Sequence, residues 1–166
     1  MRKRPPMEIL HPTSSHWPAL EAALADLADS SLVIEHGAGL YSTPTIARSH
    51  ACVLCIESHE GWADWARWMY RDYYGAEVTG SIPWARVKDA SLAFIDGPAE
   101  ERGPLLSACL EAGVPTIIAH DTGIKTRDYY GYRPYHFTVT QYEITNPVDR
   151  TTVWRLKPPM GVPLDA

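Results

Sequence analysis

Hydrophobic and polar positions in this chain follow two different patterns that alternate from one segment to the next. In the first pattern, short apolar runs rich in β-branched residues end in glycine, proline or an ionisable residue, which is typical of buried strands. These runs are residues 31–39, 51–58, 91–98 and 114–121. A weaker, more polar run at residues 75–81 predicts a short strand at an edge of the sheet.

In the second pattern, apolar residues recur at helical spacing between the strand-like runs. The predicted helices are residues 15–29, 42–50, 60–74 and 99–113. Ser14 or Ser15 is the expected cap of the first helix, and Thr43 is the expected cap of the second. Gly113 is a natural stop for the last helix.

The order of these elements defines the expected fold class. Repeated alternation of strand and helix implies a parallel sheet with helices on both faces. Two β-branched segments, residues 136–145 and 151–157, follow, and residues 146–150 join them as a hairpin. We therefore expect an α/β three-layer sandwich. Its seven-stranded sheet would be mostly parallel and would carry a C-terminal antiparallel hairpin.

Length and composition narrow the class of protein. A chain of 166 residues, 45% of them hydrophobic and without a linker-like segment, suits a single domain spanning 1–166. We expect residues 1–14 to form a flexible N-terminal tip. The net charge of −5 argues against a nucleic-acid partner. No stretch reaches the ~20 apolar residues of a membrane span, and no signal peptide is visible, so we expect a cytoplasmic protein.

The three cysteines fit a reducing compartment. Cys52 and Cys55 have a CxxC spacing, but they lie inside an apolar run and no second pair completes a zinc site. Together with Cys109 they are predicted to be core residues. Trp62, Trp65 and Trp68 recur at helical spacing, and we expect them in the core or at an interface.

Candidate chemistry gathers where the four strong strand-like runs end. Each run finishes in ionisable side chains, namely Glu35 and His36, Glu57, Asp96, and His120 and Asp121. The carboxyl ends of parallel strands meet along one rim of a sheet, and ligands bind there near the point where the strand order reverses. We therefore expect these side chains to form one site.

Two glycines and an acid indicate what this site binds. Gly37 and Gly39 allow the backbone to approach a ligand closely. Glu57 lies 20 residues beyond Gly37, where an acid can accept two hydrogen bonds from a ribose diol. Each feature alone also fits a tight loop or a solvated strand end, but together they favour a nucleotide-like ligand. The dinucleotide pattern GxGxxG would need a third glycine where the chain has Ser42.

Residues 33–43, 53–62 and 92–106 resemble the class I S-adenosylmethionine-dependent methyltransferase family. They look most like the small branch whose first motif reads acid-x-Gly-x-Gly followed by Tyr-Ser-Thr. The closing hairpin is similar to the last two strands of the family, which dinucleotide-binding domains lack. The resemblance covers residues 32–156 and implies a Rossmann-like methyltransferase fold whose S-adenosylmethionine-binding core spans that range.

The resemblance also implies roles for individual residues. Glu35, Gly37, Ala38 and Gly39 would form the loop beneath the methionine part of the cofactor, and Ser42 and Thr43 would help to bind its carboxylate. Glu57 would hold the ribose hydroxyls, and Ser58 with Trp62 would lie near the adenine. Asp96 would face the region of methyl transfer. The cofactor-binding residues implied in this way are Glu35, Gly37, Ala38, Gly39, Ser42, Thr43, Glu57, Ser58 and Asp96.

Methyl transfer is an in-line displacement on a sulfonium carbon, for which the protein supplies orientation and a base. Asp96, His120 and Asp121 are the expected catalytic residues, with His120 and Asp121 handling the proton. Some members of the family hold a divalent ion through acids at the ends of these two strands. Asp96 and Asp121 could do so here. However, Thr122 replaces the usual asparagine, and we do not favour a metal.

The prediction is therefore an S-adenosylmethionine-dependent methyltransferase that acts on a small molecule, with O-methylation expected. The aromatic stretch 127–137 either stacks on the substrate or covers the sheet. One alternative is an NAD-dependent oxidoreductase, against which the closing hairpin argues. Another is a non-catalytic cofactor-binding or scaffold protein, because the chain has little insertion to hold a substrate. A homo-oligomer in which a partner subunit completes the site stays open.

Overall fold

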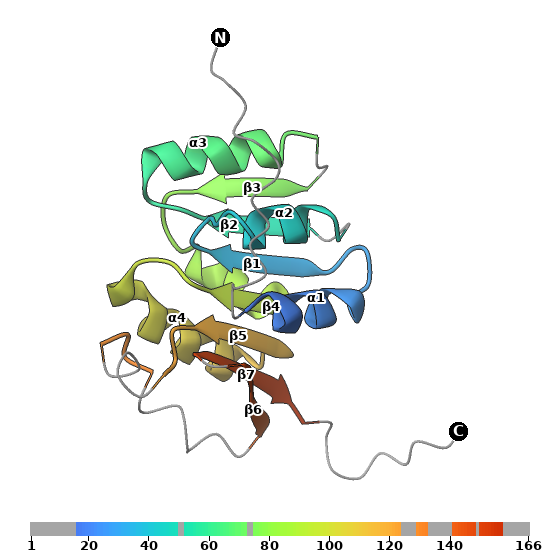
Figure 1. Cartoon of the computed structure of the whole chain (residues 1–166), viewed down its shortest axis with the longest axis vertical. Coiled ribbons are helices and arrows are strands. Elements are labelled where there is room, and N and C mark those ends of the chain that lie inside the picture. Colours follow the sequence, from blue (N-terminus) through green and yellow to red (C-terminus); the bar gives the residue numbers. More distant parts are fainter. Residues whose placement is uncertain are drawn as a thin grey trace.

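Figure 1 shows the computed structural model of the chain, in which helices cover a twisted central sheet. The structure describes residues 16–49, 52–72, 75–123, 129–132, 141–148 and 150–157. Its elements are α1 (Trp17–Ala25), β1 (Leu32–His36), α2 (Ser42–Ala47), β2 (Cys52–Ile56), α3 (Glu60–Met69), β3 (Ala76–Thr79), the 3₁₀ helix η1 (Trp84–Asp89), β4 (Ala90–Ile95), α4 (Ala99–Ala112), β5 (Thr116–His120), β6 (Tyr142–Val148) and β7 (Thr151–Leu156). The predicted N-terminal tip and the expected caps Ser14 and Ser15 lie outside the described residues.

The seven strands form one sheet in the order β3-β2-β1-β4-β5-β7-β6. Strands β1 to β5 pair in parallel, whereas β7 is antiparallel to both β5 and β6. The predicted α/β fold class, with a mostly parallel sheet and a closing antiparallel hairpin, is confirmed. Because β1 pairs with β2 on one side and with β4 on the other, the strand order reverses between β1 and β4.

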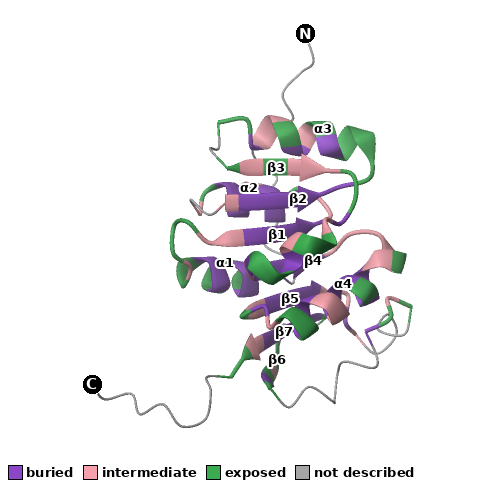
Figure 2. Ribbon diagram, turned by 180° about the vertical axis from the view of Figure 1, so that it is seen from behind, coloured by how far each residue is buried: buried purple, intermediate pink, exposed green. Residues whose placement is uncertain are grey.

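The sheet separates the core into two clusters, and the central strands are buried on both faces (Figure 2). Val33 packs in the cluster with α1, α2 and α3, whereas Ile34 packs in the cluster with α4 and η1. Successive strand residues point to opposite faces. Glu35 therefore faces α2 and α3, and His36 faces α4, although the two residues are neighbours in sequence.

Helix α2 begins differently from the prediction. Tyr41 precedes its first residue, and Thr43 lies inside the helix rather than capping it. The hydroxyl of Thr43 bonds Glu35 and the backbone N–H of Gly39 instead. Helix α4 ends as predicted, with Gly113 at φ +74° in the left-handed conformation that glycine adopts easily.

Helix α3 buries small residues rather than its tryptophans. Ala63 and Ala66 form its buried face, while Trp62 is 39% exposed and Trp65 and Trp68 are half-buried. The expectation that these tryptophans belong to the core is wrong, because the helix turns its alanine face toward the sheet. Their place at an interface stays a prediction.

The closing hairpin has a tighter turn than predicted. β6 runs to Val148 and β7 begins at Thr151, and Arg150 between them has φ +65°. The expected strand residues 136–140 lie outside the described part of the chain. All three cysteines are free, with Cys55 and Cys109 buried and Cys52 half-buried. None of the helices in the described ranges has the length and apolar character that a membrane crossing requires.

Candidate cofactor-binding and active site

The loops that follow β1 and β4 touch each other at the point where the strand order reverses. A Cβ atom on Gly37 would lie 2.7 Å from the Cα atom of Gly97, closer than real Cβ atoms pack. Gly37 also has φ +88°, in the left-handed region that other residues resist. The local backbone therefore requires glycine at this position whether or not a ligand binds there.

Glu57 follows the end of β2 and lies against the same loop. Its Oε2 atom accepts a hydrogen bond from the N–H of Ala38 at 3.0 Å, and Oε1 accepts one from the N–H of His59 at 2.7 Å. The structure thus brings Glu57 and the glycine loop together. Its contact with a ribose stays a prediction. Ser58 is exposed beside it, and its place near an adenine also stays a prediction.

Glu35 is fully buried and points into the core beneath α2 and α3. Its Oε1 atom accepts a hydrogen bond from the Thr43 hydroxyl at 2.7 Å, and Oε2 accepts one from the Tyr70 hydroxyl at 2.8 Å. Burial raises the pKa of Glu35, and hydrogen bonds from neighbouring side chains oppose this rise. Thr43 Oγ1 also accepts the N–H of Gly39 at 3.0 Å, so Glu35 supports the glycine loop through Thr43.

Three of the residues that the resemblance implied for cofactor binding lie inside the structure. Glu35, Ser42 and Thr43 are buried, at 0%, 2% and 0% exposure, and their part in cofactor binding stays a prediction. They hold the loop from inside because the carboxylate of Glu35 needs hydroxyl partners in the core. The half-buried backbone from Gly37 to Gly39 is the part of this loop that a ligand can reach.

His36 performs a similar role on the other face of the sheet. Its Nδ1 atom accepts a hydrogen bond from the N–H of Gly97 at 3.3 Å, and Nε2 lies 3.0 Å from Oε2 of Glu101. Burial lowers the pKa of His36, although Glu101 opposes this effect. The ring is therefore neutral, and its Nε2–H donates to Glu101. A Cβ on Gly97 would lie 2.5 Å from this ring, so Gly97 is also required.

Asp96 lies immediately after β4, at the centre of a polar cluster. Its Oδ1 atom is 3.2 Å from Nδ1 of His120 and 3.0 Å from the guanidinium of Arg102. Asp121 extends the cluster, since its Oδ2 atom lies 3.5 Å from Arg102 and 3.7 Å from His120. The structure thus brings together Asp96, His120 and Asp121, the predicted catalytic residues. Their catalytic role stays a prediction.

Arg102 holds this cluster in place, and the sequence analysis missed it. Its side chain is only 8% exposed and donates hydrogen bonds to the backbone carbonyls of Asp96, Gly97 and His120. The guanidinium also lies 4.1 Å from the ring centre of Tyr130. The signal was present, because Arg102 occupies the apolar face of a helix beside Leu105 and Leu106.

His120 has a shifted pKa, and Asp121 has an unusual backbone conformation. Burial works against a charge on His120, but its hydrogen bond to Asp96 and the carboxylate charges of Asp96 and Asp121 outweigh burial and raise its pKa. Asp121 has φ +57°, an uncommon conformation for any residue other than glycine. Backbone conformations of this kind cluster at active sites and ligand-binding loops.

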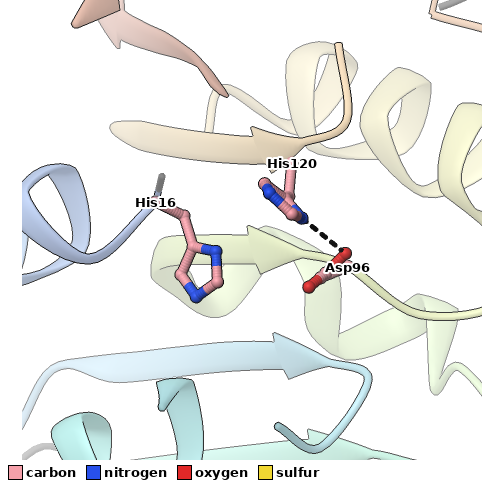
Figure 3. A group of neighbouring side chains, drawn as sticks. All are labelled: His16, Asp96 and His120. Carbon is pink, nitrogen blue, oxygen red and sulfur yellow. Dashed lines mark hydrogen bonds and ion pairs between the residues drawn. The ribbon is translucent and has the colours of Figure 1, made fainter. Parts of the chain in front are cut away.

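His16, directly before α1, is the second residue that the sequence analysis missed. It is 6% exposed, and its ring centre lies 4.8 Å from that of His120 and 5.0 Å from that of Phe94. Burial, followed by the neighbouring His120, lowers the pKa of His16 to about 4. Figure 3 shows His16 on the same side of the strands as Asp96 and His120. The sequence offers no local signal for this contact, because His16 reaches the site from a distant part of the chain.

The predicted aromatic stretch 127–137 is described only at residues 129–132. Tyr132 is fully buried in the cluster with α4, which agrees with an aromatic cover on the sheet. Tyr130 lies against Arg102, and Tyr129 is 73% exposed. Contacts of this stretch with a substrate stay a prediction.

Comparison with known proteins identifies the fold. No protein-family model and no curated protein matches the sequence. An O-methyltransferase of Bacillus cereus, solved in complex with SAH, is 17% identical with a TM-score of 0.58, over 90% of this chain and 94% of that protein. An rRNA methylase of Streptococcus thermophilus is 11% identical with a TM-score of 0.59, over 95% of this chain and 99% of that protein. An RNA methyltransferase of Salinibacter ruber, solved with S-adenosyl-L-homocysteine, is 19% identical with a TM-score of 0.54, over 89% and 95% of the two chains.

The chain has the fold of the class I S-adenosylmethionine-dependent methyltransferases. The resemblance seen in the sequence is thereby confirmed at the level of the fold. In this methyltransferase fold, β1 and β4 flank the point where the strand order reverses. The glycine loop and Glu57 lie on the β1 side, and Asp96, His120 and Arg102 lie on the β4 side.

Proposed function

We propose that this chain is an S-adenosylmethionine-dependent methyltransferase that methylates an oxygen atom of a small molecule. The observation that carries this proposal is the carboxylate of Glu57, which lies against the glycine loop where the strand order reverses. The solved methyltransferases of the same fold, two of them in complex with the demethylated cofactor product, support it.

The residues at this point fit a nucleoside that carries a diol. A carboxylate has about four lone-pair positions, and Glu57 uses one on each oxygen for the N–H groups of Ala38 and His59. The remaining positions can accept both hydroxyls of a ribose. Gly37 and Gly97 leave no side chain between the two loops, so the methionine part can lie on the half-buried backbone of Gly37 to Gly39.

The β4 side supplies the groups for the transfer itself. When bound, S-adenosylmethionine supplies an activated methyl group and a neutral thioether leaving group. We assign to Asp96, His120 and Asp121 the orientation of the acceptor hydroxyl and the removal of its proton. A lone pair of the acceptor oxygen forms the new bond to carbon, the carbon–sulfur bond breaks toward sulfur, and the hydroxyl proton passes to this cluster.

A small molecule suits the charge of the chain better than RNA does. Two of the similar structures are RNA methyltransferases by name, but a chain of net charge −5 repels phosphates. We therefore propose neither a nucleic-acid nor a membrane partner. The free thiols support a cytoplasmic location. Release of S-adenosylhomocysteine with RNA, and not with phenols or hydroxy acids, would contradict the choice of a small-molecule acceptor.

Calorimetric titration with S-adenosylmethionine, S-adenosylhomocysteine and NAD tests the cofactor. We expect both sulfur nucleosides to bind at one per chain and NAD to bind far more weakly. A preference for NAD would support the oxidoreductase alternative and overturn the proposal. His120→Ala and Asp121→Asn should retain cofactor binding and lose turnover. Binding by the parent chain with no turnover on any acceptor would favour the scaffold alternative.

Glu57→Ala tests the ribose contact directly. We expect it to weaken cofactor binding by at least ~1 kcal/mol, because a hydrogen bond to a charged group is lost. Glu60→Ala, at an exposed position in the first turn of α3, is the matched control and should leave affinity unchanged. The thermal midpoint of both variants should be measured, since Glu57 also holds two backbone N–H groups. Equal affinity in the folded Glu57→Ala variant would show that the ribose assignment is wrong.

A further inference from the structure

We propose that His16, Asp96 and His120 form a binding site for a divalent transition-metal ion, for which Zn²⁺ is the simplest probe. Each residue offers one ligand atom, and these atoms all lie within 4.8 Å of one another. Figure 3 shows the imidazole of His120 turned toward the carboxylate of Asp96, with His16 on the same side of the strands. The binding of the ion does not depend on the proposed function; only its use in catalysis rests on it.

The distances lie close to those of a metal centre. Ligand atoms around a tetrahedral zinc ion with bonds near 2.1 Å are about 3.4 Å apart. Nδ1 of His120 and Oδ1 of Asp96 are already 3.2 Å apart. His16 is the more distant member, and its imidazole must move by about 1.4 Å to bring ligand atoms that now spread over 4.8 Å to that spacing. The ion would replace the hydrogen bond between Nδ1 of His120 and Oδ1 of Asp96 and would bind both side chains in its place.

The burial of His16 points independently to a ligand. Within the described part of the chain, Nδ1 of His16 is buried and has no hydrogen-bond partner. Its residue is 6% exposed and lies between the rings of Phe94 and His120. A buried polar atom without a partner costs free energy, and buried nitrogen atoms are normally satisfied. A metal ion accepts the lone pair of a neutral imidazole and so removes this cost.

The donor set selects the kind of ion. Two imidazole nitrogens with one carboxylate oxygen suit Zn²⁺, Fe²⁺, Co²⁺ or Ni²⁺, whereas Mg²⁺ and Ca²⁺ prefer oxygen ligands. This set is not the pair of acids, Asp96 and Asp121, that the family resemblance suggested and that we did not favour. It uses a histidine from before α1 and another from the end of β5.

The charges around the three ligands can accommodate a cation. The guanidinium of Arg102 lies 3.0 Å from Oδ1 of Asp96 and would repel a bound cation. The two negative charges of Asp96 and Asp121 together exceed that single positive charge. Hydrogen bonds from Arg102 also fix the position of Asp96, as partners of metal-binding carboxylates commonly do. Three protein ligands leave at least one position for water or an acceptor oxygen. If the ion is bound, His120 would serve as its ligand, and Asp121 would be the group left to accept the proton of the acceptor.

Zinc titration of the full chain, after removal of metal with a chelator, tests the site. We expect one Zn²⁺ per chain, and at least tenfold weaker binding in His16→Ala and in His120→Ala. His59→Ala is the matched control, because His59 is exposed outside this cluster, and it should bind Zn²⁺ like the parent chain. Circular dichroism checks that each variant is folded. Co²⁺ in place of Zn²⁺ should give visible absorption bands of a nitrogen- and oxygen-bound ion that disappear in His16→Ala.

Each outcome is decisive. Absence of zinc binding by the parent chain would overturn the proposal, as would equal zinc binding by the folded His16→Ala variant or loss of binding in His59→Ala. Titration with S-adenosylmethionine, before and after metal removal, separates this proposal from the proposed function. Zinc binding without S-adenosylmethionine binding would support the metal site and contradict the methyltransferase assignment. S-adenosylmethionine binding without zinc binding would support the assignment and contradict the metal site.

Discussion

The two sides of the strand reversal hold their charged groups in different ways. On the β1 side, the carboxylates of Glu35 and Glu57 are held by backbone N–H groups and by hydroxyls. On the β4 side, Asp96 is held by a buried guanidinium and an imidazole that come from α4 and β5. The first side relies on neutral partners, and the second relies on opposite charges.

This difference has consequences for chemistry. On the β1 side, the partners of the carboxylates are N–H and hydroxyl groups that carry no charge and do not readily take up or release protons. The β4 side contains groups whose charges depend on one another, and such groups are suited to bind cations and to move protons. Under the proposed function, the β1 side would recognise the cofactor and the β4 side would act on the acceptor.

Removing the buried guanidinium should have the largest effect. Arg102→Met keeps much of the side-chain volume but removes the guanidinium that pairs with the Asp96 carboxylate and donates to three backbone carbonyls. We expect a loss of about 4 kcal/mol in unfolding free energy, as for other buried pairs that lose one partner. Arg67→Met, at an exposed ion pair with Asp64, is the matched control and should cost less than about 1 kcal/mol. If urea denaturation gives the same loss of unfolding free energy for Arg102→Met and Arg67→Met, the buried guanidinium does not hold the β4 side in place.

A side chain at the glycine contact should have the next largest effect. Gly37→Ala places a Cβ 2.7 Å from Gly97 at a positive φ, and we expect a loss of about 3 kcal/mol. Gly80→Ala adds a Cβ with nothing within 4 Å and should change stability by less than about 1 kcal/mol. Thermal denaturation of the two variants measures the difference. A tolerant Gly37→Ala variant would mean that the two loops are not pressed together.

Loss of the hydroxyl beneath the glycine loop should have a smaller effect. Thr43→Val removes the donor to Glu35 and the acceptor for the Gly39 N–H while it preserves side-chain shape. We expect a cost of about 2 kcal/mol, the usual penalty for leaving buried polar groups unpaired. Thr79→Val, at a partly exposed position on the edge strand β3, serves as the control. If both variants unfold at the same urea concentration, Thr43 does not couple Glu35 to the loop.

The smallest effect should appear only as a dependence on pH. Burial raises the pKa of Glu35 above its ordinary value of 4.5, so the folded chain holds this proton more tightly than the unfolded chain. The contribution of protonated Glu35 to the free energy of unfolding is therefore complete below pH 4.5. It is lost as the pH rises from there through the raised pKa of Glu35 in the folded chain. Glu35→Gln should match the parent near pH 4.5 and lose less stability at higher pH. Parallel curves of unfolding free energy against pH would show that Glu35 titrates alike in both states.

Much of the fold could be predicted from the sequence. Apolar runs separated by helical segments predicted the strands, and β-branched residues predicted the closing hairpin, because hydrophobic periodicity and residue type are local properties of the sequence. The helix faces were less certain. α3 has both tryptophans and alanines at helical spacing, and periodicity alone could not decide that Ala63 and Ala66 face the sheet.

The candidate site was predictable in its strand ends but not in its partners. Glu57 and the glycine loop lie 19 residues apart, and parallel strands bring them together in any sheet of this order. His16 and His120 are separated by most of the chain, and their contact depends on how α1 crosses the sheet. Arg102 reaches its three carbonyls because the first turn of α4 lies next to the ends of both β4 and β5.

The sequence by itself determined the alternation of strands and helices, the glycine turn and the acids at the strand ends, because each depends on residues close together in the chain. Tertiary structure alone decided which of these groups are buried beneath the glycine loop and which cluster at the strand ends. It buried Glu35 and Thr43 beneath the loop and joined His16 to Asp96 and His120. Such contacts depend on packing between segments that are far apart in sequence, and no local pattern encodes that packing.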